Sequence, residues 1–306
     1  MISVILPCFN EENTIAHVIC ELREKLGKDV HIIVVDNGST DGTYFAAMQC
    51  QVDVHKEPKQ GKGFAFRKGL LNIRKESKVI FLVDGDGTYG LSNLPRDVDY
   101  ILNEGFDMVV GNRIIENNES KPFREGHVIG NRFFSEFSRK MFTVNISDAL
   151  SGYRVMSRGF ATSLTDYAGK FELETELNAH AFHLDISVRN SDVLYKSRPE
   201  GSQSKLRTYS DGLNILRRIF SLWFTERPLR AYFSLALPLY LISFVLSMRA
   251  ILPFFETGLV PNLPSLVASI GIFLLASTLS MAGLVLDRMN VLRRSISRYN
   301  YSQSNE

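Results

Sequence analysis

The sequence predicts an α/β domain with a mainly parallel sheet, followed by two helices that cross a membrane. Short β-branched runs alternate with helical patterns over about the first 200 residues. Polar, turn-forming residues follow these runs, and two long apolar segments stand near the C-terminus. With 306 residues, 45% of them hydrophobic, and a net charge of +2, the composition excludes disordered, collagen-like and disulfide-framework proteins.

The alternation gives four strands and four helices in the N-terminal part of the chain. The expected strands are Ser3–Leu6, His31–Val35, Val79–Val83 and Met108–Val110. The expected helices are Thr14–Leu26, Gly42–Ala47, Gly63–Ile73 and Leu94–Asn103. Ligands of such folds bind beyond the carboxyl ends of the strands, so the loops that follow the strands are the expected functional region.

Acidic residues are concentrated in three of these loops, which span residues 7–12, 36–42 and 84–89. Carboxylates that share a pocket are costly unless a cation or ligand hydroxyl groups satisfy them. Asp84 and Asp86 follow an apolar strand with only Gly85 between them, so both can approach one region. Oxygen ligands of this kind suit Mg²⁺ or Mn²⁺, which also bind diphosphate.

The two apolar segments are expected at residues 231–251, with Arg249 as the one charge, and at 265–286, with no charge. Each is long enough to cross a membrane as a helix. The loop between them has no lysine or arginine, whereas Lys205–Arg230 carries a net charge of +4 and Asp287–Arg298 one of +3. The positive-inside rule then predicts a transmembrane hairpin with both ends in the cytoplasm. A pair of buried helices in a soluble domain is the alternative.

The remaining segments complete the expected organisation. Residues 211–230 form an amphipathic pattern, either an interfacial helix or a helix packed on the soluble domain, and 297–306 a short polar tail. No signal peptide is evident, and Cys8, Cys20 and Cys50 lack metal-ligand spacing, so a cytosolic N-terminal portion is expected. The expected domains are residues 1–208 (catalytic), 209–230 (juxtamembrane), 231–287 (hairpin) and 288–306 (basic tail).

Six motifs in order carry a family resemblance: LPCFNEE, VVDNGSTDGT, KQGKG, VDGDGTY, SDALSGYR and RPEGSQSKLRT. Over residues 2–208 the sequence resembles the family-2 glycosyltransferases with a GT-A fold. More narrowly, it resembles the polyprenyl-phosphate branch that contains dolichol-phosphate mannose synthase and bacterial polyprenyl-phosphate glucosyltransferases. The resemblance implies inverting transfer of a hexose or N-acetylhexosamine from a nucleotide sugar to undecaprenyl or dolichyl phosphate. The DGDGTY motif departs from the D-A-D-L form common in mannose and glucose transferases, so a UDP-sugar is favoured and GDP-mannose is the alternative.

The resemblance also implies a donor site with Mg²⁺ or Mn²⁺ as cofactor. Asp86 would be the principal metal ligand, and Asp84 would lie near the ribose and the metal. Glu174 or Glu176 would hold sugar hydroxyl groups, although a solvated acidic helix face explains them as well. The residues implied in nucleotide binding are Pro7, Asn10, Glu11, Asp36, Gly61 and Gly63.

A cationic set is implied for the phosphates. Arg113 and Arg132 would lie near the donor and the acceptor phosphate, and the loop with Arg198, Ser204 and Lys205 would complete a clamp. Two anions that react need guanidinium and ammonium groups to offset their repulsion. The implied catalytic residues are Asp86, Arg113, Arg132, Arg198 and Lys205, and the acceptor side would be shaped by Asp148, Gly152, Tyr153 and Arg154.

Three other functions compete with this interpretation. A processive polysaccharide synthase would carry a Q-x-x-R-W motif, which the surroundings of Trp223 lack. A non-catalytic membrane component would not need the acidic loops, and a nucleotidyltransferase would show a glycine-rich, lysine-bearing N-terminal loop. The expected partners are a nucleotide sugar, a polyprenyl phosphate and the lipid bilayer of a cytoplasmic or inner membrane; no nucleic acid is expected, and homo-oligomerisation is left open.

Overall fold

The computed structural model describes residues 1–114, 145–164, 173–196, 220–221, 223–260 and 262–304. The chain forms two compact units. The first, here called the α/β unit, contains Met1–Ile215 and Ile296–Glu306, and the second, the hairpin unit, contains Leu216–Ser295. The chain therefore leaves the α/β unit, forms the hairpin unit and returns for its last residues.

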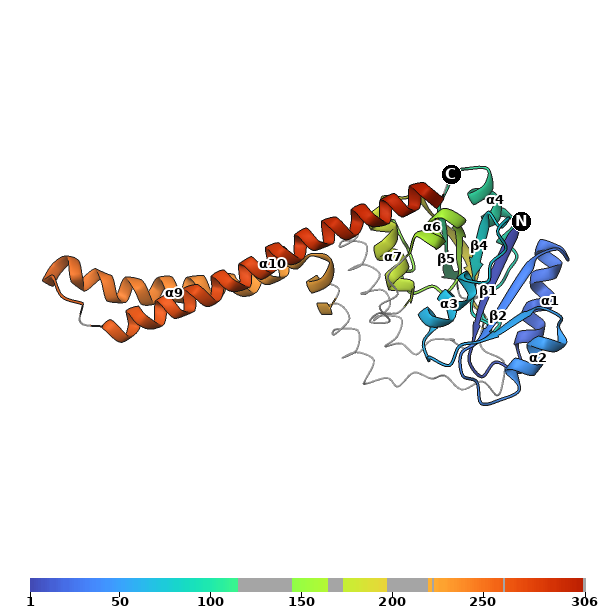
Figure 1. Cartoon of the computed structure of the whole chain (residues 1–306), viewed down its shortest axis with the longest axis horizontal. Helices are drawn as coiled ribbons and strands as arrows, with labels where there is room; N and C mark the ends of the chain where they lie inside the picture. Colours follow the sequence, from blue (N-terminus) through green and yellow to red (C-terminus); the bar gives the residue numbers. More distant parts are fainter. Residues whose placement is uncertain (115–144, 165–172, 197–219, 222, 261, 305–306) are drawn as a thin grey trace. The chain divides into compact units, whose positions relative to one another are not determined.

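A seven-stranded sheet in the order β3-β2-β1-β4-β6-β5-β7 forms the α/β unit (Figure 1). Strand β6 is antiparallel to both of its neighbours, and the other neighbouring pairs are parallel. This confirms the expected mainly parallel α/β sheet. The strands are β1 (Ile2–Cys8), β2 (His31–Asp36), β3 (Asp53–Lys56), β4 (Val79–Leu82), β5 (Met108–Ile114), β6 (Arg154–Ser157) and β7 (Val188–Leu194).

The helices of the α/β unit include the four expected from the sequence. Their bounds are α1 (Ile15–Leu26), α2 (Thr43–Gln49), α3 (Lys62–Leu70) and α4 (Leu94–Leu102). Helix α7 (Leu173–Leu184) carries Glu174 and Glu176, where the sequence predicts a helix face. Helix α6 (Arg158–Ser163) and strands β3, β6 and β7 were not expected.

The core lies around the central strands. Strands β2 and β4 are buried at every position, because helices cover both faces of the sheet there. Helix α1 contributes Ile15, Val18, Ile19 and Leu22 at helical spacing, and all four are buried.

The strand order defines where a ligand can bind. From β1 the chain moves through α1 to β2 on one side, whereas β4 pairs with the other side of β1. The carboxyl ends of β1 and β4 therefore flank a topological switch point, and in open α/β sheets the ligand crevice lies at such a point. The loops after β1 and β4 are the ones that carry Asn10 and Glu11, and Asp84 and Asp86.

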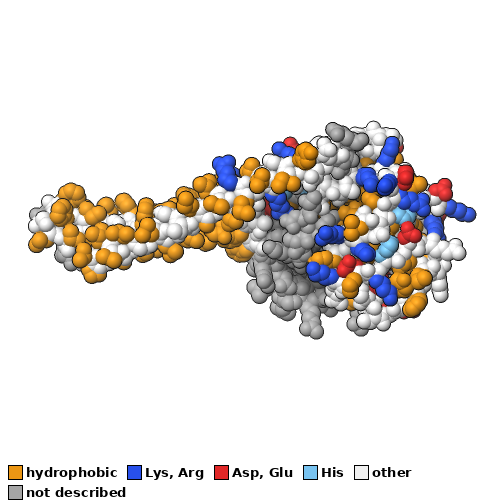
Figure 2. Space-filling view, viewed as in Figure 1, with side chains coloured by type: hydrophobic (Ala, Val, Ile, Leu, Met, Phe, Trp, Pro, Cys, Tyr) orange, Lys and Arg blue, Asp and Glu red, His pale blue; other side chains and the backbone are white. Residues whose placement is uncertain are grey.

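The hairpin unit is built from α9 (Pro228–Thr257) and most of α10 (Leu263–Ser304). Both helices are long and apolar enough to cross a membrane, and only 17% of the most apolar window of each is buried. Apolar side chains cover both helices in Figure 2. Small serine side chains form hydrogen bonds between the two helices. Ser243 Oγ donates to the backbone carbonyl of Ser269 (2.8 Å), and Ser247 Oγ donates to the hydroxyl group of Ser269 (3.0 Å).

The observed helices extend beyond the expected spans at residues 231–251 and 265–286. Residues 211–219 and 222 of the amphipathic segment 211–230 lie outside the described residues. Residues 297–304, expected as a polar tail, continue α10, and Ile296 onwards belongs to the α/β unit.

Candidate functional site

The acidic loops after β1, β2 and β4 converge beside Cys8. Burial raises the pKa of the Cys8 thiol well above its ordinary value, and the carboxylates of Glu11, Asp36, Asp84 and Asp86 raise it further. Four carboxylates from three loops therefore lie close enough to one buried side chain to act on it. This is the arrangement that the sequence predicts for the carboxyl edge of the sheet.

The turn after β2 is tied to the loop after β1. Asn10 has a left-handed backbone (φ 58°), and its Oδ1 accepts a hydrogen bond from the backbone of Thr40 (2.8 Å). The amide of Glu11 donates to Thr43 Oγ1 (2.8 Å), and Asp36 Oδ1 accepts from the amide of Ser39 (3.0 Å). These contacts fix the loops in which the expected nucleotide-binding residues Pro7, Asn10, Glu11 and Asp36 lie.

Asn37 holds the loop before α3 against the same edge. Its side-chain amide donates to the carbonyls of Glu57 (3.0 Å) and Lys59 (2.7 Å), and its Oδ1 accepts from the amide of Gly61 (2.7 Å). Gly61 has φ 136°, a backbone that favours glycine, whereas the α-carbon of Gly63 faces open space. The sequence analysis singled out both glycines but not Asn37.

Asp86 is buried in the DGDG turn, with 4% of its surface exposed. Its Oδ1 accepts hydrogen bonds from Thr88, from the backbone amide (3.1 Å) and from the hydroxyl group (2.7 Å). Two donors on one oxygen fix the direction in which the carboxylate points.

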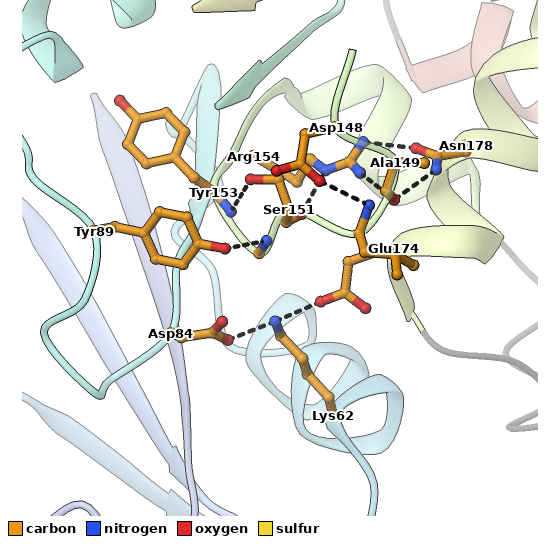
Figure 3. A network of polar contacts seen from close by, with 12 residues as sticks. Lys62, Asp84, Tyr89, Asp148, Ala149, Ser151, Tyr153, Arg154, Glu174 and Asn178 are labelled. Carbon is orange, nitrogen blue, oxygen red and sulfur yellow. Dashed lines mark hydrogen bonds and ion pairs between the residues drawn. The ribbon is translucent and has the colours of Figure 1, made fainter. Parts of the chain in front are cut away.

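Lys62 joins Asp84 to Glu174 (Figure 3). Its ammonium lies 2.5 Å from Asp84 Oδ1 and 2.6 Å from Glu174 Oε1. Burial lowers the pKa of Lys62, but the two carboxylates outweigh burial and hold it above its ordinary value. The sequence alone does not predict this role of Lys62, because its place in the KQGKG motif is the one sign of it.

Asp84 and Asp86 fit a divalent cation that a diphosphate ligand would complete. Within the part of the chain that the structure describes, no group of three or more histidine, cysteine, aspartate or glutamate residues forms a ready-made metal site. Mg²⁺ binds in proteins through one or two carboxylates together with substrate phosphates and water. The buried, oriented Asp86 beside Asp84 supplies that number of carboxylates.

A rigid loop, residues 148–154, closes over this cluster. The amide of Gly152 donates to Tyr89 Oη (2.8 Å), and a Cβ on Gly152 would overlap the Asp84 carboxylate and lie 2.8 Å from Lys62 Nζ. Burial raises the pKa of Tyr89, so its hydroxyl group stays protonated. Gly152 is therefore placed where only a glycine lets the loop approach the Lys62–Asp84 pair.

Arg154 holds this loop from inside. It is fully buried and donates to the carbonyls of Ser151 (3.0 Å) and Ala149 (3.1 Å) and to Asn178 Oδ1 (2.7 Å). Burial lowers the pKa of Arg154 to about 10, which still leaves the guanidinium charged at neutral pH. The loop is thereby fixed to α7, the helix that carries Asn178 and Glu174.

Arg113, at the end of β5, contacts the start of the same loop. Its Nε and Nη2 donate to the two oxygens of Asp148 (2.6 and 2.9 Å), and the guanidinium lies 5.4 Å from the centre of the Tyr195 ring. Burial lowers the pKa of Arg113, but Asp148, together with Tyr89 and Tyr195, holds it above its ordinary value. The structure thus places Arg113 beside the cluster in a paired state.

The other expected site residues divide into two groups. Glu176 lies on α7, as Glu174 does. Glu176 is half-buried, whereas Glu174 is buried. The residues expected around the acceptor phosphate, Arg132, Arg198, Ser204 and Lys205, lie outside the described residues.

Comparisons with known proteins identify the family. A family model for glycosyl transferase family 2 matches residues 3–164, and the chain belongs to this family. Glycosyltransferase AglJ of Haloferax volcanii is 30% identical over 228 residues, which cover 74% of each chain. The dolichyl-phosphate hexose transferase of the same organism is 24% identical over 226 residues, 74% of this chain and 95% of that protein.

A solved structure shows the same fold. The glucosyl-3-phosphoglycerate synthase of Mycobacterium tuberculosis, in complex with Mn²⁺, UDP and glucosyl-3-phosphoglycerate, superposes with a TM-score of 0.55. It is 22% identical in sequence, and the match covers 74% of this chain and 79% of that one. The α/β unit therefore has the GT-A-like arrangement.

Proposed function

We propose that the protein is a membrane-bound inverting glycosyltransferase that moves a hexose or N-acetylhexosamine from a nucleotide sugar to a polyprenyl phosphate. The observation that carries the proposal is the cluster of Asp84, Asp86, Lys62 and Glu174 at the switch point of a family-2 glycosyltransferase sheet. Its carboxylates and ammonium offer both a cation site for a diphosphate and hydrogen-bonding groups for sugar hydroxyls.

The donor binds across the carboxyl ends of β1 and β4 in this proposal. The loops that hold Asn10, Glu11 and Asp36 receive the nucleoside, and Gly61 and Gly63 allow the backbone to approach it. The sugar hydroxyls are held by Asp84, Lys62 and Glu174. The two carboxylates accept hydrogen bonds and the ammonium donates them, which suits hydroxyl groups because these both donate and accept. A UDP-sugar is favoured over GDP-mannose, as the sequence analysis expected.

Asp86 and Asp84 hold Mg²⁺ or Mn²⁺ in the proposed complex. The cation, when bound, offsets the negative charge of the departing nucleoside diphosphate. The likeness to a synthase crystallised with Mn²⁺ and UDP supports the presence of a divalent cation. Thr88 keeps one oxygen of Asp86 hydrogen-bonded, which fixes the direction in which the carboxylate points.

The proposed reaction is an in-line substitution at the anomeric carbon. A phosphate oxygen of the lipid forms the new bond to that carbon, while the bond from the carbon to the nucleoside diphosphate breaks with inversion. A phosphate monoester has its second pKa near about 6 and is largely dianionic at neutral pH, so no protein base is needed. Arg132, Arg198 and Lys205, with Ser204, are proposed to bind the phosphates; Arg113 is proposed to join them from its place beside Asp148.

The two apolar helices support a lipid acceptor. A polyprenyl phosphate keeps its phosphate at the membrane surface, so the α/β unit must work there. We propose that α9 and α10 span a cytoplasmic or inner membrane as a hairpin with both flanks and the α/β unit in the cytoplasm, following the distribution of basic residues. Relatives named for polyprenyl and dolichyl phosphate transfer support the same acceptor.

A transfer assay tests the proposal. Purified full-length protein in detergent is incubated with undecaprenyl or dolichyl phosphate, Mg²⁺ or Mn²⁺, and a panel of labelled UDP- and GDP-sugars. The expected result is label that enters the organic phase only when both the lipid phosphate and the cation are present. Label that stays aqueous with every donor would overturn the lipid acceptor, and transfer that persists with a chelator would overturn the role of the cation.

A further inference from the structure

The end of the last helix is part of the α/β unit. Residues 296–304, here called the C-terminal segment, continue α10 but group with residues 1–215. Ser297 is buried, with 6% of its surface exposed, whereas Tyr299 is 66% exposed. One face of this short helical stretch is therefore covered, and two of its side chains make hydrogen bonds to the α/β unit.

Arg298 bonds to the last turn of α7. Its Nε donates to the backbone carbonyl of His183 (3.1 Å), the residue before the end of the helix at Leu184. The last four carbonyls of an α-helix lack partners within the helix, and a basic group there also interacts favourably with the helix dipole. Arg298 thus caps the C-terminal end of α7, whereas Glu174 lies in the first turn of the same helix.

Tyr301 bonds to the corner where three strands meet. Its hydroxyl donates to Asp107 Oδ1 (2.5 Å), which also accepts from Ser157 Oγ (3.0 Å). The backbone of Asp107 bonds to Ser157 (2.8 Å) and to Ser187 (3.0 Å), so it joins the start of β5, the end of β6 and the turn that leads from α7 into β7. Both contacts of the C-terminal segment therefore bear on α7 or on the turn directly after it.

We propose that the C-terminal segment is a positioning element of the donor site, in which Arg298 and Tyr301 fix α7 so that Glu174 faces Lys62. Neither residue touches the substrate in this proposal. The link to donor binding rests on the proposed function, whereas the hold on α7 does not.

Hydrogen–deuterium exchange of the full-length protein in detergent tests the hold on α7 directly. In Arg298→Ala the backbone amides of residues 173–184 are expected to exchange up to about fivefold faster, while those of α1 keep their rate. Tyr301→Phe is expected to act in the same direction, and Arg298→Lys to restore slow exchange. Tyr299→Phe, on the exposed face of the same stretch, is the matched control and should change nothing.

Steady-state kinetics test the link to the donor. Arg298→Ala is expected to raise the KM for the nucleotide sugar up to about fivefold with kcat nearly unchanged, and Arg298→Lys to reverse the rise.

Two outcomes of the exchange experiment would overturn the proposal. The first is an exchange rate of α7 in Arg298→Ala and Tyr301→Phe that equals the rate in the Tyr299→Phe control. A uniform rise in α1 and α7 would also overturn it, because it would report a loss of stability of the whole unit.

The two proposals can fail separately. A protein that transfers no sugar from any donor, but whose α7 still responds to Arg298→Ala, contradicts the proposed function and supports the positioning role. A protein that transfers sugar with an unchanged donor KM in every variant contradicts the positioning role alone.

Discussion

Asp86 is buried at the carboxyl edge of the sheet and has one carboxylate oxygen held by Thr88. Replacing it by Asn keeps the shape but removes the charge that a cation needs. We expect Asp86→Asn to lower transfer at least about a hundredfold, the scale of losing a main electrostatic group in an active site. Labelled sugar in the organic phase measures this. Asp99→Asn, on the exposed face of α4, is the control, and equal activity of the two variants would contradict the assignment of Asp86.

Gly152 tests the close approach of the loop to the cluster. The added methyl group of Gly152→Ala would collide with the Asp84 carboxylate and with Lys62. We expect the variant to fold and to lose donor affinity by at least about fivefold, since overpacking of this kind costs about 1–3 kcal/mol and 1.4 kcal/mol corresponds to about tenfold. Donor KM and the thermal midpoint, measured together, separate the two effects. Wild-type affinity in this variant would show that the loop moves away when the donor binds.

Asp97 gives a pH dependence of stability. It is fully buried and accepts a hydrogen bond from Tyr153 Oη (2.7 Å), and burial raises its pKa. A carboxyl group whose pKa is raised by folding stabilises the protein fully below its unfolded pKa, and this contribution is lost as the pH rises through the folded value.

Asp97→Asn keeps an oxygen acceptor for Tyr153 and does not ionise. We therefore expect the thermal midpoint of the variant to gain on that of the wild type as the pH is raised from about 4, the ordinary pKa of an aspartate, to 7. Unfolding in detergent at stepped pH measures the difference. A difference that is constant across this range would contradict burial as the cause.

The sequence predicts the acidic residues of the site better than their partners. Asp84 and Asp86 follow a fully apolar strand, so their place at the sheet edge is evident from neighbours in the sequence. Lys62 could not be assigned in this way, because Glu174 is 112 residues away and the pair exists only after the sheet has formed. For the same reason the pair of Arg113 with Asp148 is absent from the sequence analysis.

At the scale of elements, α9 and α10 approach each other closely at Gly283. A Cβ on Gly283 would lie 2.8 Å from the Cβ of Tyr232 and 3.2 Å from the carbonyl oxygen of Pro228. Gly271, on the same helix, has open space around it. Small residues permit such contacts between membrane helices.

We expect Gly283→Ala to lower the stability of the hairpin by about 1–3 kcal/mol relative to Gly271→Ala. Both variants gain the same helix propensity, so the comparison isolates the packing. The midpoint of thermal unfolding in detergent, followed by helical circular dichroism, measures the difference. Equal midpoints would mean that α9 and α10 are not packed closely at Gly283.

The elements missed from the sequence share a physical cause. Strand β6 has only four residues and pairs antiparallel with β4 on one side and β5 on the other, so its place is set by its neighbours. Strand β7 carries Arg189 and Asp192 at an edge and lacks an apolar run. The C-terminal segment is polar, and its helical form depends on α10 continuing from an apolar segment and on contacts with residues such as His183 and Asp107.

At the scale of the whole molecule, the basic flanks predict an orientation. Leu259, between α9 and α10, is expected outside the cytoplasm, and Ser302, in the C-terminal segment, inside it. In a background without Cys20 and Cys50, we expect Leu259→Cys to react with an impermeant maleimide on sealed cells, and Ser302→Cys to react only after permeabilisation. Both side chains are exposed in the structure. The reverse pattern would contradict the positive-inside assignment.

The α/β unit takes its residues from both sides of the hairpin unit, and this has a consequence for biosynthesis. Residues 296–304 leave the ribosome after both apolar segments, so the contacts of Arg298 and Tyr301 can form only after these segments have been synthesised. Domains generally fold during synthesis in order from the N-terminus. The α/β unit, in contrast, can complete its fold only after the two apolar segments that would anchor it have been synthesised.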